Sequence, residues 1–265
     1  MDIERVSLLK VPIDILPPEQ LAERIYELLA AGKTQAAKGS AVQAGSPAGE
    51  RQAQNIVLLS LWDLLRARRN NDYRSYVLKA ALVIPISRSL QSGIRFLTGK
   101  TAVRYMPFDF VISLLTALEE REFTLYLIGG KAQTLRKIEN NIRQTFPRLR
   151  IVGRYQGGFK RQDEPSIVEA IRKASPSLLL VGKGVRGEEQ WIAKYTGKLN
   201  QGIRLWCSDL YDVFAERKHR PSRQTFERGW EWMTYCFRNP LLYFRIFPYM
   251  YYKILLLIYK IFPKE

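Results

Sequence analysis

The sequence is poor in the side chains that build disulfide frameworks, metal centres and histidine-based active sites. Its 265 residues include two cysteines and one histidine. So few thiols disfavour a disulfide-stapled secreted fold and a zinc site, and they favour a reduced, cytoplasmic setting. The N-terminus also lacks a long apolar run and is charged from its second residue. We therefore expect no signal peptide.

Acidic residues are also scarce relative to basic ones. The chain has 42 lysines and arginines against 25 aspartates and glutamates, a formal net charge of +17. A surface of this sign favours polyanions such as nucleic acid, phosphorylated small molecules or an anionic membrane. The sequence contains no nucleic-acid recognition motif, so nucleic acid is not expected as a partner.

Short apolar runs alternate with amphipathic segments along most of the chain. Strands are expected at 6–13, 55–62, 81–87, 123–128 and 178–181, with another inside 147–159. Helices are expected at 18–31 and 63–71, in the segment that follows residue 109, from after residue 131 to about residue 146, and at 166–174. Runs that are apolar throughout fit strands covered on both faces. The order predicts an α/β fold with a mostly parallel sheet and helices on both of its faces.

Two of these strands end in glycine loops. Gly129, Gly130 and Lys131 follow one strand, and Gly182 and Gly184 follow another. Parallel strands bring such loops to one carboxyl edge, where ligands bind in open α/β sheets. Backbone N–H groups at a helix start suit a phosphate, and Lys131 is a candidate to pair with it. The alternative readings are that the glycines only make tight connections and that Lys131 is simply exposed.

The composition changes in two places. Residues 34–53 are small and polar without an apolar period, which predicts a flexible loop. The sequence predicts a sheet domain over 1–205 and a basic, aromatic C-terminal appendage over 206–265.

Several segments together carry a resemblance to a known family. FTLYLIGGK (123–131), PRLRIVGRYQGGF (147–159), SLLLVGKGVRGEEQWIAK (177–194) and the stretch from SDLYDVF (208–214) through RNP (238–240) occur in the order and spacing of the WecG/TagA/CpsF glycosyltransferases. The resemblance implies a Rossmann-like enzyme at the cytoplasmic face of the cell membrane, peripheral to it. It implies transfer of an N-acetylmannosamine-type sugar from a UDP donor to a polyprenyl-linked acceptor in cell-wall or surface-polymer synthesis, without a metal or other cofactor.

The resemblance also implies a set of substrate-binding residues. In the second half of the chain the basic segment is expected to fold over the active site, and Arg220, which precedes a proline, is expected to meet the pyrophosphate. A homo-oligomer is a further candidate partner, through packing of the C-terminal segment on a second subunit. The implied substrate-binding set is Gly129, Gly130, Lys131, Gly182, Gly184, Glu189, Trp191, Arg104, Asp212 and Arg220.

The chain departs from the family pattern where the general base is expected. Ile86 and Ser87 stand where the family has Asp-Gly, and an isoleucine cannot accept a proton. Either Asp63, Asp109 or Glu188 has taken over this role, or the protein has kept the fold, lost the chemistry and serves as a binding partner in polysaccharide assembly.

The C-terminal segment 240–262 is dense in aromatic and aliphatic residues. A proline and several basic residues interrupt it, which argues against a membrane-spanning helix. The same composition suits a helix lying in the headgroup region of an anionic membrane. Packing of this helix on the protein's own core or on a second subunit is the alternative.

Overall fold

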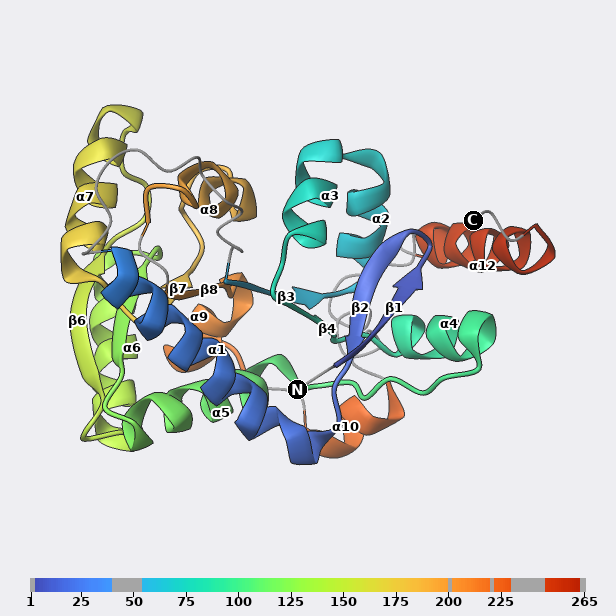
Figure 1. The fold of residues 1–265 in the computed structure, drawn as a ribbon, viewed down its shortest axis with the longest axis horizontal. Helices are drawn as coiled ribbons and strands as arrows, with labels where there is room; N and C mark the ends of the chain where they lie inside the picture. Colours follow the sequence, from blue (N-terminus) through green and yellow to red (C-terminus); the bar gives the residue numbers. More distant parts are fainter. Residues whose placement is uncertain (1–2, 40–53, 200–201, 220–221, 230–245, 263–265) are drawn as a thin grey trace.

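A six-stranded parallel sheet forms the centre of the molecule (Figure 1). The computed structural model describes residues 3–39, 54–199, 202–219, 222–229 and 246–262. The strands are β3 (Asn55–Leu59), β4 (Leu82–Pro85), β5 (Thr124–Ile128), β6 (Arg150–Tyr155), β7 (Leu178–Val181) and β8 (Ile203–Trp206). Their order is β4-β3-β8-β7-β5-β6, and each neighbouring pair is parallel. The predicted α/β class is confirmed.

Side chains of each central strand alternate between two hydrophobic clusters. In β7, Leu178 and Leu180 enter one cluster, while Leu179 and Val181 enter the other. Successive residues of a strand point to opposite faces, so a strand buried on both sides must be apolar throughout. This explains the uninterrupted apolar runs in the sequence.

Helices cover both faces of the sheet, as Figure 1 shows. One face carries α1 (Pro18–Gly39), α5 (Pro107–Glu120), α6 (Ala132–Thr145) and α9 (Ser208–Phe214). The other face carries α2 (Leu61–Arg69), α3 (Asn71–Leu78), α7 (Glu164–Ala174) and α8 (Glu189–Tyr195). A short 3-10 helix, η1 (Arg161–Asp163), precedes α7.

The prediction of a single strand at 6–13 is wrong, because the segment forms a hairpin. β1 (Glu4–Leu8) pairs antiparallel with β2 (Val11–Ile15), and the turn between them consists of Leu9 and Lys10. Both turn residues have positive φ, 52° and 68°, as a two-residue turn of the primed type requires. The sequence lacks the Asn-Gly or Asp-Gly signal of such turns. Burial of the Leu9 side chain stabilises the turn instead.

A buried carboxylate ties the hairpin to the main sheet. Asp14 accepts hydrogen bonds from the Arg5 side chain at 2.6 and 2.9 Å and from the backbone N–H of Val83 at 2.7 Å. Val83 belongs to the edge strand β4. The hairpin therefore covers an edge that would otherwise be open to pairing with another chain.

The loop expected at 34–53 begins later than predicted. Helix α1 continues through Gly39, so residues 34–39 are helical. Their run of glutamine, alanine and lysine has high helix propensity, which the absence of an apolar period concealed. Residues 40–53 lie outside the described residues.

The C-terminal helix α12 (Ile246–Ile261) packs on α4 (Arg88–Thr98). Tyr252 is buried over Gly93, and its hydroxyl donates to the Ser89 carbonyl oxygen at 2.9 Å. Any side chain at position 93 would collide with the Tyr252 ring, so Gly93 makes the close approach possible. A further short helix, α10 (Arg223–Arg228), precedes the segment 230–245, which lies outside the described residues. The expected boundary at residue 205 stays a prediction.

Candidate substrate site at the carboxyl edge of the sheet

Three glycine loops meet at the carboxyl ends of β5, β6 and β7. The Gly129 N–H donates to the Tyr155 carbonyl at 2.9 Å, and the Gly182 N–H donates to the Ile128 carbonyl at 2.7 Å. The Gly157 and Gly158 N–H groups donate to the carbonyls of Gly130 and Gly184 at 2.8 and 2.7 Å, and Gly130 N–H to that of Lys183 at 2.5 Å. These five N–H groups bind backbone oxygens. A phosphate at this edge therefore needs other donors, such as side chains.

The closest approach between these loops lies at the topological switch point of the sheet. The chain leaves β5 toward β6 and leaves β7 toward β8, in opposite directions along the sheet. An added Cβ on Gly129 would lie 2.6 Å from the Gly182 carbonyl oxygen. Glycine is thus required for this backbone contact, in addition to the positive φ of 115° at Gly129.

Tyr211 of α9 forms the floor under these loops, a role that the sequence patterns did not reveal. Its hydroxyl lies 3.1 Å from the Ile128 carbonyl oxygen and 2.9 Å from that of Leu180, at the ends of β5 and β7. Its ring lies against Gly182, where an added Cβ would collide with it. Burial raises the pKa of Tyr211 well above its ordinary value, so the hydroxyl stays protonated.

Charged side chains surround this floor. Asp212 pairs with Lys183 of the β7 loop at 2.9 Å and lies 3.9 Å from Lys218. Lys131 follows the β5 loop and is exposed at the start of α6. The structure therefore brings Asp212 to the predicted glycine loops, and places Lys131 and Lys183 beside them.

A cluster of acidic residues around Arg66 connects α2 with the start of α8. The Arg66 guanidinium lies 3.1 Å from the Glu189 carboxylate, 3.6 Å from that of Glu188 and 4.4 Å from the centre of the Tyr73 ring. Burial raises the pKa of Glu189, and the neighbouring Asp63 and Glu188 add to the rise. The Arg66 charge lowers the pKa of Glu189 and offsets part of this rise. Through its ion pair with Arg66, the predicted residue Glu189 holds the loop against α2.

Asp63 has a local structural role at the start of α2. Its carboxylate accepts hydrogen bonds from the Ser60 N–H at 2.9 Å and from the Ser60 hydroxyl at 2.5 Å. In return, the Asp63 N–H donates to the Ser60 hydroxyl oxygen, which completes a capping box. Burial raises the pKa of Asp63 against these hydrogen bonds. This candidate base thus serves as a helix cap.

Glu188 and Asp109 remain as exposed candidate bases. Glu188 has the backbone angles φ 53° and ψ −125°, which are unfavourable for a residue with a side chain. Backbone strain of this kind clusters at functional sites. Asp109 is exposed in the first turn of α5.

Two of the expected substrate-binding residues, Trp191 and Arg104, make contacts within the protein. Trp191 is 2% exposed, and its ring packs between Phe159 and Tyr195, so its side chain supports the β7 loop from below. Arg104 lies 3.7 Å above the Phe226 ring and donates to the Phe226 carbonyl oxygen, so it holds α10 on the body of the protein. Arg220 lies outside the described residues.

Ile86, which stands where the resemblance implies a general base, directly follows β4. The Ile86 N–H donates to the Leu59 carbonyl at 2.9 Å, and its side chain is partly buried. The adjacent Ser87 hydroxyl is buried and finds no hydrogen-bond partner among the described residues. Unpaired polar atoms in this state are uncommon in folded proteins.

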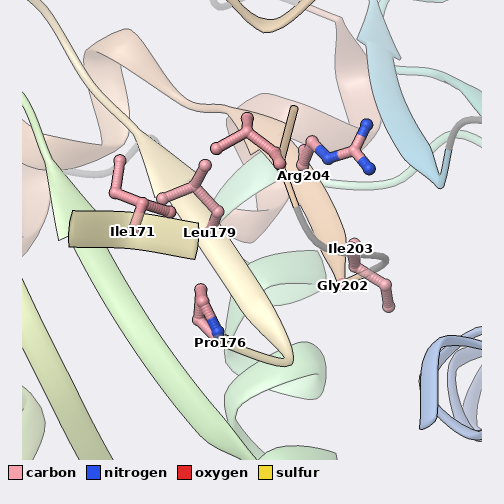
Figure 2. Close-up of a pocket in the computed structure, with 7 residues that line it drawn as sticks. Ile171, Pro176, Leu179, Gly202, Ile203 and Arg204 are labelled. Atoms are coloured by element: carbon pink, nitrogen blue, oxygen red, sulfur yellow. The ribbon is translucent and has the colours of Figure 1, made fainter. Parts of the chain in front are cut away.

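A cavity at the opposite, amino edge of the sheet does not qualify as a ligand site. It has a volume of about 10 Å³, close to the minimum for one water molecule. Figure 2 shows Ile171, Leu179 and Pro176 around it, while the Arg204 guanidinium extends away from Ile171 and Leu179. Burial lowers the pKa of Arg204 to about 10, and Asn55 binds its side chain at 3.3 Å.

The described residues contain neither a metal-binding cluster nor a membrane-spanning helix. Within 3–39, 54–199, 202–219, 222–229 and 246–262, no three acidic, cysteine or histidine residues lie together in a way that could hold a metal ion. Metal independence itself stays a prediction. Of the helices in these ranges, none has both the length and the apolar character needed to cross a bilayer.

A parallel sheet covered on both faces, with glycine loops and charged side chains at its carboxyl edge, defines a Rossmann-like α/β protein whose ligand side is that edge. More specifically, the chain belongs to the WecG/TagA/CpsF family of glycosyl transferases, whose family model matches residues 6–264. The resemblance noted in the sequence is confirmed.

Two relatives carry a specific activity in their names. The chain is 21% identical over 174 residues to the N-acetylglucosaminyldiphosphoundecaprenol N-acetyl-beta-D-mannosaminyltransferase of Bacillus subtilis (strain 168). The matched region covers 66% of this chain and 67% of that protein. The protein of the same name from Bacillus spizizenii (strain W23) matches with the same identity and coverage.

Proposed function

We propose that this chain transfers an N-acetylmannosamine-type sugar from a UDP donor to a polyprenyl-diphosphate-linked acceptor at the cytoplasmic face of the membrane. The observation that carries the proposal is the family match over residues 6–264, together with the hydrogen-bonded glycine loops at the carboxyl edge. The names of the two Bacillus relatives give the sugar and the acceptor class. Cell-wall or surface-polymer synthesis is the process in which such a product is used.

In this proposal, lysine side chains bind the diphosphate of the donor. As the bond between the sugar and UDP breaks, negative charge develops on the leaving diphosphate, and fixed cations stabilise it. Lys131 is exposed beside Gly130, and Lys183 sits in the β7 loop. Lys183 is held by Asp212, which fixes its ammonium group near this edge. No metal is needed for charge neutralisation of this kind.

The acceptor hydroxyl must lose a proton as its oxygen attacks the sugar. We assign this role to an exposed carboxylate, Glu188 or Asp109, because Asp63 is occupied by its helix cap. Removal of a general base lowers turnover by about a hundredfold to ten-thousandfold. Turnover of Glu188→Gln and Asp109→Asn at saturating substrates distinguishes the two candidates. A residue whose variant keeps wild-type turnover is not the general base.

Membrane association is the third part of the proposal, and the outward face of α12 supports it. Phe247, Met250, Ile254, Leu257 and Ile261 recur at helical spacing and are each more than half exposed. The opposite face of the helix is buried on α4, with Tyr252 and Leu256 in the core. Among the tyrosines of this helix, Tyr249 and Tyr252 pack on the protein, whereas Tyr251 is exposed.

The experiment that tests the donor site is a calorimetric titration with UDP and UDP-N-acetylhexosamines in nanodiscs. Lys131→Ala should weaken UDP binding about tenfold, as expected for the loss of a charged contact. Lys173→Ala is the matched control, because Lys173 is exposed at the end of α7 that lies at the amino edge. If wild-type protein does not bind UDP at millimolar concentration, or both variants bind equally, the donor assignment fails.

A catalytically silent relative is the second candidate, and Ile86 at the position of the family's base favours it. A silent binding partner predicts that Ile86→Asp changes nothing in cells, while deletion of residues 240–265 abolishes function. A gain of transfer activity in Ile86→Asp would instead show that the donor and acceptor sites are still competent.

A further inference from the structure

A groove lies between α2 and the first turn of α12. Its volume is about 460 Å³, within the range of small-molecule sites. The groove is lined by Trp62, Leu65, Arg66, Arg69, Phe247 and Tyr251. We call it the α2–α12 groove.

The groove combines apolar walls with two cations. Trp62, Phe247 and Tyr251 present aromatic surface, whereas Arg66 and Arg69 place two guanidinium groups along α2. The Arg69 guanidinium lies 5.9 Å from the centre of the Tyr251 ring, so the cation and the apolar wall adjoin each other. An occupant that matches both features has an anionic group, with phosphate the best partner of an arginine fork, joined to a hydrocarbon chain.

The apolar wall continues into the exposed face of α12. Phe247 and Tyr251 line the groove and are 61% and 43% exposed, and Met250 and Ile254 extend the same face along the helix. A hydrocarbon chain that leaves the groove over these residues therefore stays on apolar surface. This arrangement suits a lipid whose chain ends in a bilayer, and it fits a freely soluble phosphate poorly.

The cationic wall continues into the candidate substrate site. Arg66 lines the groove, and its guanidinium also contacts the carboxylates of Glu189 and Glu188 in the loop after β7. Helix α2 begins directly after β3, at the carboxyl edge of the sheet. A phosphate in the groove is therefore one side chain away from a candidate base.

We propose that the α2–α12 groove binds the phosphate end and the first isoprenoid units of the polyprenyl-linked acceptor. This assignment rests on the proposed function and adds the place where the acceptor lipid enters. Arg69 and Arg66 bind the phosphate oxygens, Trp62 and Tyr251 flank the first isoprenoid units, and the rest of the chain follows the exposed face of α12 into the bilayer. The sugar on the phosphate then points toward the loop that carries Glu188.

The test uses farnesyl diphosphate, a short isoprenoid diphosphate, titrated into the full chain. Arg69→Ala and Trp62→Ala should each weaken its binding at least tenfold. Arg69 is exposed, whereas Trp62 is 38% exposed and its ring lies 6.4 Å from that of Tyr249, so circular dichroism of each variant checks that the fold is intact. Arg136→Ala is the matched control, since Arg136 is exposed on α6, which covers the other face of the sheet.

Three further measurements identify the occupant. UDP binding should be unchanged in Arg69→Ala, so a variant that loses farnesyl diphosphate binding but still binds UDP supports the groove. If wild-type protein binds neither ligand, the result counts against the proposed function itself. Inorganic pyrophosphate should bind much more weakly than farnesyl diphosphate. In a transfer assay, Arg69→Ala should raise the KM for the lipid acceptor and leave the KM for the donor unchanged.

Several results would overturn the assignment. Wild-type affinity of Arg69→Ala and Trp62→Ala for farnesyl diphosphate would exclude the groove. Equal affinity for pyrophosphate and farnesyl diphosphate would show a plain anion site. If Arg69→Ala abolishes binding to phosphatidylglycerol nanodiscs but leaves farnesyl diphosphate binding intact, the groove holds a bilayer phospholipid. A change of oligomeric state in Trp62→Ala would instead indicate that a second copy of the chain occupies it.

Discussion

Replacement of Gly182 by alanine tests whether glycine is required here by the close approach of the Tyr211 ring. The new Cβ would lie 2.7 Å from Cγ of the Tyr211 ring and closer still to two other ring atoms. Carbon atoms in contact prefer separations of about 3.5–4.0 Å. The ring would therefore have to move by about 1 Å, judged from the same separations.

Tyr211 has little freedom to make this movement. Its hydroxyl lies 3.1 and 2.9 Å from two strand-end carbonyl oxygens, and a shift of that size breaks at least one of these contacts. Overpacking of a core costs about 1–3 kcal/mol, and a lost hydrogen bond adds about 1 kcal/mol. The lower conformational entropy of the unfolded alanine chain offsets about 0.4–1 kcal/mol. We expect the free energy of unfolding to fall by about 2 kcal/mol from these contributions.

The assay is thermal and urea unfolding followed by circular dichroism, and a loss of this size lowers the melting temperature by about 4–8 °C. Gly197→Ala is the matched control, because no atom lies within 4 Å of an added Cβ there. Gly158→Ala separates strain from collision, since its φ is +74° and its surroundings are also empty. Equal stability of Gly182→Ala and Gly197→Ala would refute the collision argument.

Three shorter predictions concern other parts of the chain. Burial raises the pKa of Glu189, so the contribution of this residue to stability is complete below about pH 4.5 and declines as the pH rises. The free energy of unfolding of Glu189→Gln, measured with urea, should therefore increase relative to that of wild type between pH 4 and 7. A difference between the two proteins that stays constant across this range (about 3 pH units) would contradict the stated burial effect. Arg104→Ala should loosen α10 and speed proteolysis near residues 215–229 about fivefold, the effect of about 1 kcal/mol from a cation–π contact, whereas Arg223→Ala, which removes an exposed ion pair, should not; equal rates would contradict the docking role. Leu257→Gln should weaken sedimentation with anionic vesicles about tenfold, because a buried leucine side chain contributes about 1.5–3 kcal/mol, and unchanged sedimentation would exclude this face of α12 from membrane contact.

Strand positions were predictable from the sequence because the central strands are buried on both faces. The runs around Ile56, Leu82, Leu125 and Leu178 are apolar throughout. The N-terminal hairpin was not predictable, since the positive φ values of Leu9 and Lys10 depend on tertiary burial. Strand β8 was also missed, because Arg204 breaks its apolar run and is accommodated by Asn55 from the neighbouring strand.

The candidate site could be located from the sequence, but the roles of its side chains could not. The glycine loops were expected at one edge, and the structure brings them together there. Whether Trp191 faces a ligand or the core depends on Phe159 and Tyr195, which are distant in the sequence. The role of Arg66 likewise requires α2 and α8 to be adjacent. Spacing along the chain carries no information about such contacts.

The glycine loops of the site are joined to one another through main-chain atoms, and this has a consequence for how the protein can evolve. The hydrogen bonds that join the loops after β5, β6 and β7 run from backbone to backbone, and the residues that make them are mostly glycines. A substitution at an edge position whose side chain does not pack on these loops removes none of these hydrogen bonds. A family member can therefore exchange the side chain at position 86 and still present the same platform, so that catalytic groups are replaceable one at a time while the platform persists.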